Sequence, residues 1–271
     1  YFEDGYGDPG VILTQKNEFN RNVLLTEFNA LKRISDPDNV NIFTISDGAS
    51  PEGDRPFLQK FNIKTKLMDT LFRSASPYYE RPVFFNNGKF MINSRESSDS
   101  VQNYFRVNLE DKSYTRLTNF KDPYPELKGV KKQQISYKRL DGITLGGTLY
   151  LPAGFKTGDP ALPVLIWAYP REFKTAAAAG QTKGSPHKFS IIGKASPVYW
   201  VTRGYAVLDN ADMPVVGESN TEPNDTFVEQ IRYNAEAAID HLVEMGVADR
   251  KRIAIGGHSY GAFMTANLLA H

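Results

Sequence analysis

The stretch Ile253-Ala254-Ile255-Gly256-Gly257-His258-Ser259-Tyr260-Gly261-Ala262 decides how the second half of this chain folds. It joins a short apolar run to a G-x-S-x-G pattern, and a second apolar run follows. A strand, a sharp turn and a helix in this order form a nucleophile elbow, which presents the serine hydroxyl on a strained turn. Gly257 and Gly261 carry no side chain, as the close approach of helix and strand requires. The pattern predicts Ser259 as a nucleophile; the alternative is a tight turn with an ordinary surface serine.

Acyl transfer by a serine also needs donors for the developing oxyanion. In a nucleophile elbow, the first donor is the backbone N–H of the residue after the serine, which is Tyr260 here. The second donor comes from the loop after an earlier strand. We expect that strand at residues 164–168, so the phenol of Tyr169 is the candidate. The alternative for Tyr169 is an aromatic side chain that packs at the end of a strand.

The chain offers four histidines as possible bases: His187, His241, His258 and His271. We expect His258 to point away from the serine as a core or supporting residue, and His241 to be solvated on a helix. Nothing in its sequence context marks His187. His271 stands about 18 Å along the helix axis from Ser259, at about 1.5 Å per residue. No Asp or Glu follows Ser259, so we expect the triad Asp and His to lie outside this chain.

Other site types find little support, and we expect no cofactor and no metal. The glycines at 256 and 261 have P-loop spacing, but Ala262 stands where the lysine belongs. No H-x-x-x-H or H-E-x-x-H pattern occurs, and cysteine is absent. The net charge of +1 favours neither nucleic acid nor an anionic membrane as a partner. No run of 18 apolar residues is present. Compartment and oligomeric state stay open.

Residues 1–128 have the pattern of an all-β domain. Short apolar runs alternate with turn signals, among them Asn86-Asn87-Gly88. A weak repeat relates residues 57–71 to residues 104–117, because Asn62 and Asn108, and also Leu71 and Leu117, are 46 positions apart. This period suits one four-stranded propeller blade. We therefore expect two to three blades, an incomplete β-propeller; the alternative is two unrelated hairpins in a sandwich.

Residues 129–271 alternate strands with helices, after a hairpin centred on Asp141-Gly142. We expect strands at 164–168, 206–208 and 253–255. We also expect a helix that begins with a capping box at Thr226 and ends at Gly246. The expected fold is the N-terminal half of an α/β-hydrolase domain with a mainly parallel sheet, truncated after the elbow. The strand at 253–255 would then lack a neighbour on its far edge.

The chain resembles the prolyl oligopeptidase family of serine peptidases, and within it the glutamyl endopeptidases of plastids and their bacterial relatives. The similarity rests on residues 1–10, which resemble a propeller segment, on residues 178–181, 184–186 and 214–218, which resemble hydrolase-domain loops, and above all on residues 227–267. It implies a seven-bladed propeller that caps an α/β-hydrolase domain, with a Ser-Asp-His triad in chain order. Ser259 would be the nucleophile and Tyr169 the oxyanion tyrosine. One departure is Asn210-Ala211-Asp212-Met213, where many family members have Asn-x-Arg-Gly.

We interpret the chain as a fragment of a serine peptidase and expect the fragment alone to be inactive. The complete enzyme would cleave peptide bonds through an acyl-enzyme on Ser259. The resemblance implies that a propeller lid restricts its substrates to short or unfolded peptides. Cleavage after glutamate would need a cation in the pocket, for which Arg171, Lys174, Lys183 and Arg203 qualify by charge only; each suits a solvated surface equally. One rival is a carboxylesterase-type α/β-hydrolase on the same elbow. The other is a non-catalytic propeller binding module with a vestigial hydrolase domain.

Overall fold

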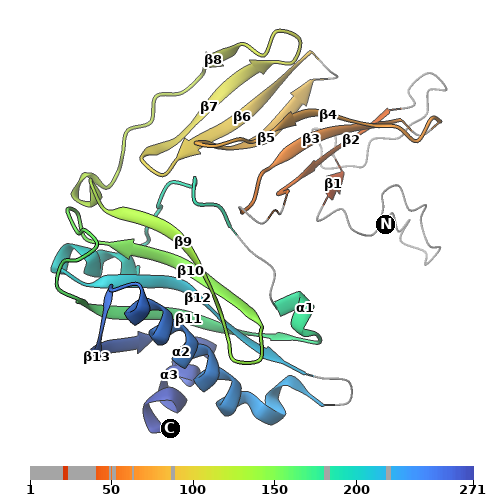
Figure 1. Ribbon diagram of the computed structural model, residues 1–271. Helices are drawn as coiled ribbons and strands as arrows, with labels where there is room; N and C mark the ends of the chain where they lie inside the picture. The colour runs from red at the N-terminus through yellow and green to blue at the C-terminus, as the bar shows by residue number, and fades with distance from the viewer. Residues whose placement is uncertain are drawn as a thin grey trace. The chain divides into compact units, whose positions relative to one another are not determined.

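The computed structural model describes residues 21–23, 41–48, 50, 53–62, 64–86, 89–179, 184–217 and 221–271 (Figure 1). They divide into two compact units. The first comprises Tyr1–Lys121 and Lys183–Phe189, and the second comprises Asp122–Thr182 and Ser190–His271. The chain thus divides seven residues before the predicted boundary at 128. Tyr124 explains the difference, because its hydroxyl donates a 2.8 Å hydrogen bond to the Ile192 carbonyl of the second unit.

The first unit contains two four-stranded antiparallel sheets whose strands follow each other in chain order. One sheet is built from β1 (Arg21–Val23), β2 (Asn41–Ser46), β3 (Phe57–Asn62) and β4 (Met68–Arg73). The other is built from β5 (Tyr79–Asn86), β6 (Phe90–Ser97), β7 (Ser100–Asn108) and β8 (Tyr114–Arg116). Side chains of both sheets share one apolar core around Leu58 and Met91. The hairpin between β5 and β6 is as predicted, although residues 87–88 lie outside the described part.

The repeat inferred from the sequence has a structural counterpart. Its two copies contain β3 and β7, the third strands of the two sheets. The backbone N–H of Asn62 donates to the Leu67 carbonyl, and that of Asn108 donates to the Ser113 carbonyl. Each turn also contains a lysine with φ of 59°, Lys66 in one and Lys112 in the other. These shared details agree with two copies of one four-stranded unit, which the sequence repeat predicts.

Residues 184–189 belong by their contacts to the first unit, although they interrupt the second in sequence. The backbone N–H of Asp54 donates to the Gly184 carbonyl at 2.6 Å, and the Gly184 N–H donates to Asp54 Oδ2 at 3.1 Å. The Phe189 N–H donates to Glu96 Oε2 at 3.0 Å. The resemblance had assigned 184–186 to a hydrolase-domain loop. These three hydrogen bonds explain why the segment groups with the first unit instead.

The second unit is a five-stranded mixed sheet of strand order β13-β11-β12-β10-β9. β9 (Lys131–Lys138) and β10 (Thr144–Leu151) form the predicted antiparallel hairpin, whereas β11 (Leu162–Phe173), β12 (Ala206–Val216) and β13 (Ala248–Gly256) run parallel. The helices are α1 (Ala176–Ala179), α2 (Phe227–Glu244) and α3 (Tyr260–Ala270), and the 3-10 turns are η1 (Pro125–Leu127), η2 (Pro197–Arg203) and η3 (Pro223–Thr226). In the described part of the chain, β13 pairs with β11 alone.

All three strands that the sequence predicts after the hairpin are longer than expected, and β13 already begins at Ala248. β11 was expected to end at Ala168, but its pairing with β12 resumes after a bulge and continues to Phe173. Tyr169 consequently lies within a strand, opposite Asp212, and not in a loop. Residues 214–216, which the resemblance placed in a loop, form the end of β12 for the same reason.

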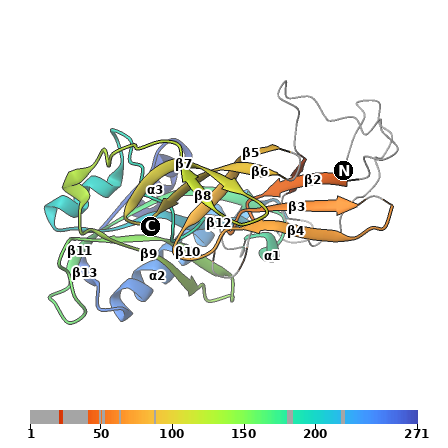
Figure 2. The same ribbon diagram turned by 90° about the horizontal axis from the view of Figure 1, so that it is seen from above.

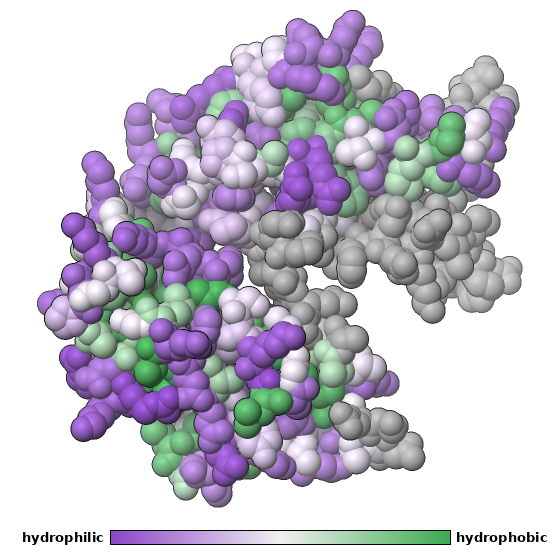
Figure 3. All heavy atoms as spheres, viewed as in Figure 1, coloured by the Kyte–Doolittle hydropathy of each residue, from purple (hydrophilic) through white to green (hydrophobic). Residues whose placement is uncertain are grey.

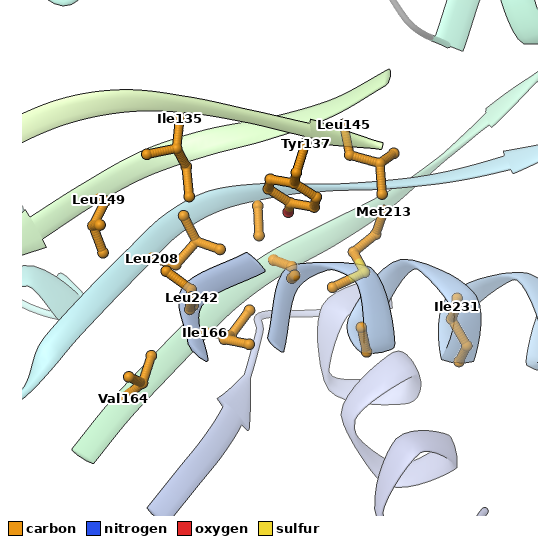
Figure 4. Packing of buried hydrophobic residues seen from close by; sticks show 14 of the residues in the cluster. Ile135, Tyr137, Leu145, Leu149, Val164, Ile166, Leu208, Met213, Ile231 and Leu242 are labelled. Atoms are coloured by element: carbon orange, nitrogen blue, oxygen red, sulfur yellow. The ribbon is translucent and has the colours of Figure 1, made fainter. Parts of the chain in front are cut away.

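The sheet alternates its side chains between two apolar layers. Ala206 and Leu208 point into the layer that contains α2, while Val207 points into a layer with η2. α2 lies along one face of the sheet in both views (Figures 1 and 2). Its Ile231 and Leu242 are fully buried, and they belong to the same apolar cluster as Met213 and Ile166 of the sheet (Figure 4). Burial of each such side chain contributes about 1.5–3 kcal/mol.

The ends of α2 match the sequence only in part. Gly246, with φ of 71°, ends the helix as predicted: its N–H donates to the Val243 carbonyl and the Val247 N–H donates to Leu242, a Schellman pattern. The predicted capping box at the start is wrong. The Thr226 side chain caps no backbone N–H, and its Oγ1 instead accepts a 2.8 Å hydrogen bond from Gln230 Nε2.

A buried polar network secures the end of β12, where β10 no longer pairs with it. Gln230 brackets Val216, because its Oε1 accepts from the Val216 N–H and its Nε2 donates to the Val216 carbonyl, both at 2.9 Å. Asn234 Nδ2 donates to the Pro214 carbonyl, and Asn234 Oδ1 accepts from Arg139 Nη1 at 2.9 Å. Hydrogen bonds from Arg139 lower the pKa of the Asp141 carboxyl. Gln230 and Asn234 were not predicted from the sequence, because their partners are distant along the chain.

The molecular surface of both units is mixed, with apolar side chains lying among polar ones (Figure 3). Leu140, in the turn between β9 and β10, is 92% exposed. Single exposed apolar residues are common in folded proteins and indicate no particular role. Among the described residues, no helix is long and apolar enough to cross a membrane.

Replacing Arg139 tests how much the polar network of Arg139, Gln230 and Asn234 contributes to the stability of the second unit. Arg139→Ala leaves the fully buried Asn234 amide oxygen without its charged donor, so we expect a loss of about 2–4 kcal/mol in the free energy of unfolding. Arg250→Ala is the matched control, because the Arg250–Asp240 ion pair is exposed and should contribute less than about 1 kcal/mol. Urea unfolding measures both. Equal losses in the two variants would show that the network contributes nothing special.

Candidate active site

Ser259 occupies a strained turn between the end of β13 and the start of α3. Its backbone has φ of 55° and ψ of −116°, which residues with a side chain rarely adopt. The turn is closed by hydrogen bonds from the Gly261 N–H to the His258 carbonyl and from the Ala262 N–H to the Ser259 carbonyl, both 2.8 Å. Ser259 is exposed. The turn therefore holds a hydroxyl outside the apolar core at the carboxyl end of a strand.

Glycine is needed on either side of the serine because this turn lies directly against β11. A side chain on Gly257 or on Gly261 would press into the Ala168 carbonyl oxygen. A side chain on Gly257 would also come within 2.7 Å of the Gly261 Cα atom. Gly256 lies against the Trp167 ring, 2.8 Å from the position that its own Cβ would take. Three glycines thus let the elbow rest on two consecutive residues of β11.

The two expected oxyanion donors come from segments that meet at this edge of the sheet. Tyr260 is the first residue of α3, and the first N–H groups of a helix have no acceptor within it. Tyr169 is 49% exposed and follows Ala168, on which the glycines rest. The Tyr169 and Tyr260 rings meet edge to face, with centroids 6.0 Å apart. Both tyrosines therefore adjoin the elbow, as an oxyanion site would require.

The Tyr260 side chain is held by groups that the sequence analysis did not identify. Its hydroxyl lies 3.3 Å from Glu172 Oε1 at the end of β11 and 3.1 Å from Asn224 Oδ1 in η3. Its ring stacks on Phe227, with centroids 5.3 Å apart. Partial burial raises the pKa of the Tyr260 phenol, and the neighbouring Glu172 carboxylate raises it further. The phenol consequently keeps its proton at neutral pH and remains a donor.

None of the four histidines, all of which lie in the described residues, has a hydrogen bond to Ser259. His258 is exposed, so the expectation of a core residue was wrong. His241 is not simply solvated, because its ring stacks on buried Tyr137 with centroids 5.3 Å apart. His187 groups with the first unit, and His271 is exposed beyond the end of α3.

Among the described residues, neither the candidate cations for a glutamate-binding pocket nor a metal site gains support. Arg171, Lys174 and Arg203 are exposed, and Lys183 lies outside the described residues. In the part of the chain that the structure covers, no group of three His, Cys, Asp or Glu could hold a metal ion.

Comparison with curated proteins gives two close relatives. No family model matches the chain. A protein of Oryza sativa subsp. japonica named "Probable glutamyl endopeptidase, chloroplastic" is 40% identical over 281 residues, and one of the same name from Arabidopsis thaliana is 39% identical. Each alignment covers 99% of this chain and 29% of the relative. The chain therefore spans less than a third of the length of either relative, and the resemblance to glutamyl endopeptidases is confirmed.

Solved structures share the fold at low identity. Oligopeptidase B from Leishmania major matches with a TM-score of 0.55 and 12% identity, over 84% of this chain and 32% of that one. An acylaminoacyl peptidase from Pyrococcus horikoshii matches with a TM-score of 0.52 and 17% identity, over 86% of this chain and 34% of that one. At these identities, the comparison establishes a common fold only.

Adding a methyl group at the elbow tests the close approach of the turn to β11. Gly257→Ala or Gly261→Ala forces the turn away from the Ala168 carbonyl, so we expect the free energy of unfolding to fall by about 2 kcal/mol or more. Gly193→Ala is the control, because its added Cβ would meet nothing within 4 Å. Thermal or urea unfolding measures all three. An elbow variant as stable as the Gly193 variant would contradict the described packing.

Proposed function

The chain is a relative of the chloroplastic glutamyl endopeptidases along 99% of its own length, and we propose that the protein carrying it is a serine peptidase that uses Ser259. The observation that carries the proposal is the turn itself: an exposed serine with φ of 55° between a parallel strand and a helix. We further propose that residues 129–271 are part of an α/β-hydrolase domain and residues 1–128 part of a β-propeller. The five-stranded sheet and the two repeated four-stranded sheets support these assignments.

The chemistry follows from the geometry of the elbow. Ser259 Oγ attacks the carbonyl carbon of the scissile peptide bond while a base removes the hydroxyl proton. The carbonyl oxygen becomes an oxyanion, which accepts hydrogen bonds from the Tyr260 N–H and the Tyr169 phenol. Collapse of this intermediate expels the amine, which takes up a proton, and leaves an acyl group on Ser259. Water then hydrolyses the acyl-enzyme and regenerates the serine.

We assign the role of base to none of the four histidines, because none of them has a hydrogen bond to Ser259 in the described part of the chain. We likewise assign no acid of this chain to a triad. The substrate class is a peptide, in keeping with the names of the relatives. Glutamate at the cleaved bond is the preference that those names suggest. Arg171, Lys174 and Arg203 are exposed cations without further distinguishing contacts, so we retain them as surface residues.

Removal of the nucleophile tests the proposal in the protein that carries this chain. Ser259→Ala should abolish measurable peptide hydrolysis, since loss of a catalytic serine costs about 10⁶-fold in kcat. Tyr169→Phe should lower kcat by about 10²-fold, as expected for the loss of one oxyanion donor. Initial rates on a panel of peptides with Glu, Ala or Lys before the cleaved bond report both effects.

Ser98→Ala is the matched control, because Ser98 is exposed in the first unit and its removal should leave the rates unchanged. Hydrolysis of p-nitrophenyl esters without cleavage of any peptide would favour the carboxylesterase alternative. Unchanged turnover in Ser259→Ala would remove the serine mechanism. A protein with no turnover of either substrate would favour the propeller binding module.

The 271-residue chain alone should react slowly. Without a bonded base, the Ser259 hydroxyl remains protonated, so we expect a fluorophosphonate probe to label the chain at least about 10²-fold more slowly than a complete serine hydrolase. Gel fluorescence over time, with Ser259→Ala as the blank, gives the rate. Labelling as fast as that of a complete hydrolase would mean that a histidine of this chain does act as the base.

A further inference from the structure

The elbow is fixed on one side by its contact with Ala168, but the opposite side also needs a constraint. A strained backbone such as that of Ser259 persists only where its surroundings determine it from several directions. Tyr260, the residue that follows the serine, supplies the first oxyanion donor of the proposed site through its backbone N–H. Any rotation of Tyr260 therefore moves both the nucleophile and this donor.

The side chain of Tyr260 is anchored at both of its ends. Its ring stacks on Phe227 of α2 at an interplanar angle of 23° and on Phe263 of α3 at 16°. Its hydroxyl reaches two other segments, β11 through Glu172 and η3 through Asn224. These two acceptors are 88 and 36 positions away in the sequence. Four segments of the second unit thus converge on one phenol beside the nucleophile.

The hydroxyl has a single proton, so it donates to Glu172 or to Asn224 but not to both at once. Either bond holds the ring at the same place, because the two oxygens lie at 3.3 and 3.1 Å from the same atom. Loss of one acceptor leaves the other available. The two residues are therefore expected to compensate for each other.

Asn224 is itself held in position. It lies in η3, directly before α2, and the next turn of the chain is secured by Gln230, which accepts from the Val216 N–H and donates to Thr226 Oγ1. Glu172 is held by the pairing of β11 with β12, where it stands opposite Val215. Both acceptors are thus carried by regular secondary structure, which suits a positioning role.

On this geometry, and resting on the proposed function, we propose that Glu172 and Asn224 are positioning residues. They fix the Tyr260 phenol and so hold Ser259 Oγ and the Tyr260 N–H in the arrangement that acyl transfer requires. Neither side chain touches the reacting atoms in this account. The effect on the reaction passes entirely through Tyr260.

Four variants of the protein that carries this chain test the proposal: Tyr260→Phe, Glu172→Ala, Asn224→Ala and the double variant Glu172→Ala/Asn224→Ala. Tyr260→Phe keeps the stacked ring and loses the hydroxyl, and we expect kcat to fall about tenfold with KM within about twofold of wild type. Each single acceptor variant should lower kcat by less than about twofold, since the other acceptor remains. The double variant should match Tyr260→Phe. Steady-state kinetics on the best peptide substrate give these values.

Tyr233→Phe is the matched control. Its hydroxyl also donates to a glutamate, Glu229 Oε1 at 2.7 Å, but on the exposed side of α2. It should leave kcat and KM unchanged. Assays run well below the melting midpoint of each variant separate positioning from loss of folded protein, because only a positioning effect persists there.

Wild-type kcat in Tyr260→Phe would overturn the proposal, and so would a double variant no worse than either single one. Multiplicative losses from the two acceptors, without the expected compensation, would also overturn it. Unchanged turnover in Ser259→Ala would instead overturn the proposed function and this inference with it. Loss of turnover in Ser259→Ala together with a normal Tyr260→Phe variant would overturn the inference alone.

Discussion

The contact between the elbow and the Ala168 carbonyl is the constraint on which the second unit's site depends. Gly257 and Gly261 lie so close to that oxygen that neither position has room for a methyl group. The contact fixes the helix start against the strand and forces the serine between them into a φ of 55°. Because Tyr169 is the next residue of the same strand, the contact also sets the distance between the turn and the phenol. One backbone contact thus places both the proposed nucleophile and the proposed donor.

This close packing requires a rigid sheet beneath it. β11 is paired on both sides, by β12 and β13, and its buried side chains pack against α2. The end of β12, which has lost β10 as a neighbour, is secured by the amides of Gln230 and Asn234 and by Arg139. These side chains make hydrogen bonds to the backbone of β12 where β10 no longer pairs with it. The polar network thus takes the place of strand pairing at this end of the sheet. The site therefore draws its rigidity from residues that lie far from it in the sequence.

Local patterns predicted the elements that depend on local chemistry. Asp141-Gly142 indicated the hairpin because a glycine with φ of 86° suits its turn, and Gly246 indicated the end of α2. The 46-residue repeat predicted two to three four-stranded blades, and the described residues of the first unit form two four-stranded sheets. Long-range bonds lay beyond such reasoning. The continuation of β11 to Phe173 depends on β12, and the grouping of residues 184–189 with the first unit depends on Asp54. His241 was expected in solvent because its stacking partner, Tyr137, belongs to a distant strand.

For the candidate site, Ser259, Tyr260 and Tyr169 were proposed from their places next to an expected strand or turn, and their catalytic roles stay predictions. Glu172 and Asn224 could not be found in this way, because only the folded chain brings them to the Tyr260 hydroxyl.

The most direct test of the central claim is to locate the covalent adduct of a fluorophosphonate on the protein that carries this chain. Proteolysis followed by mass spectrometry identifies the modified residue. This account predicts one phosphonylated serine, Ser259, in the peptide that spans the strand and the helix. An adduct on another residue, with Ser259 unmodified, would contradict it.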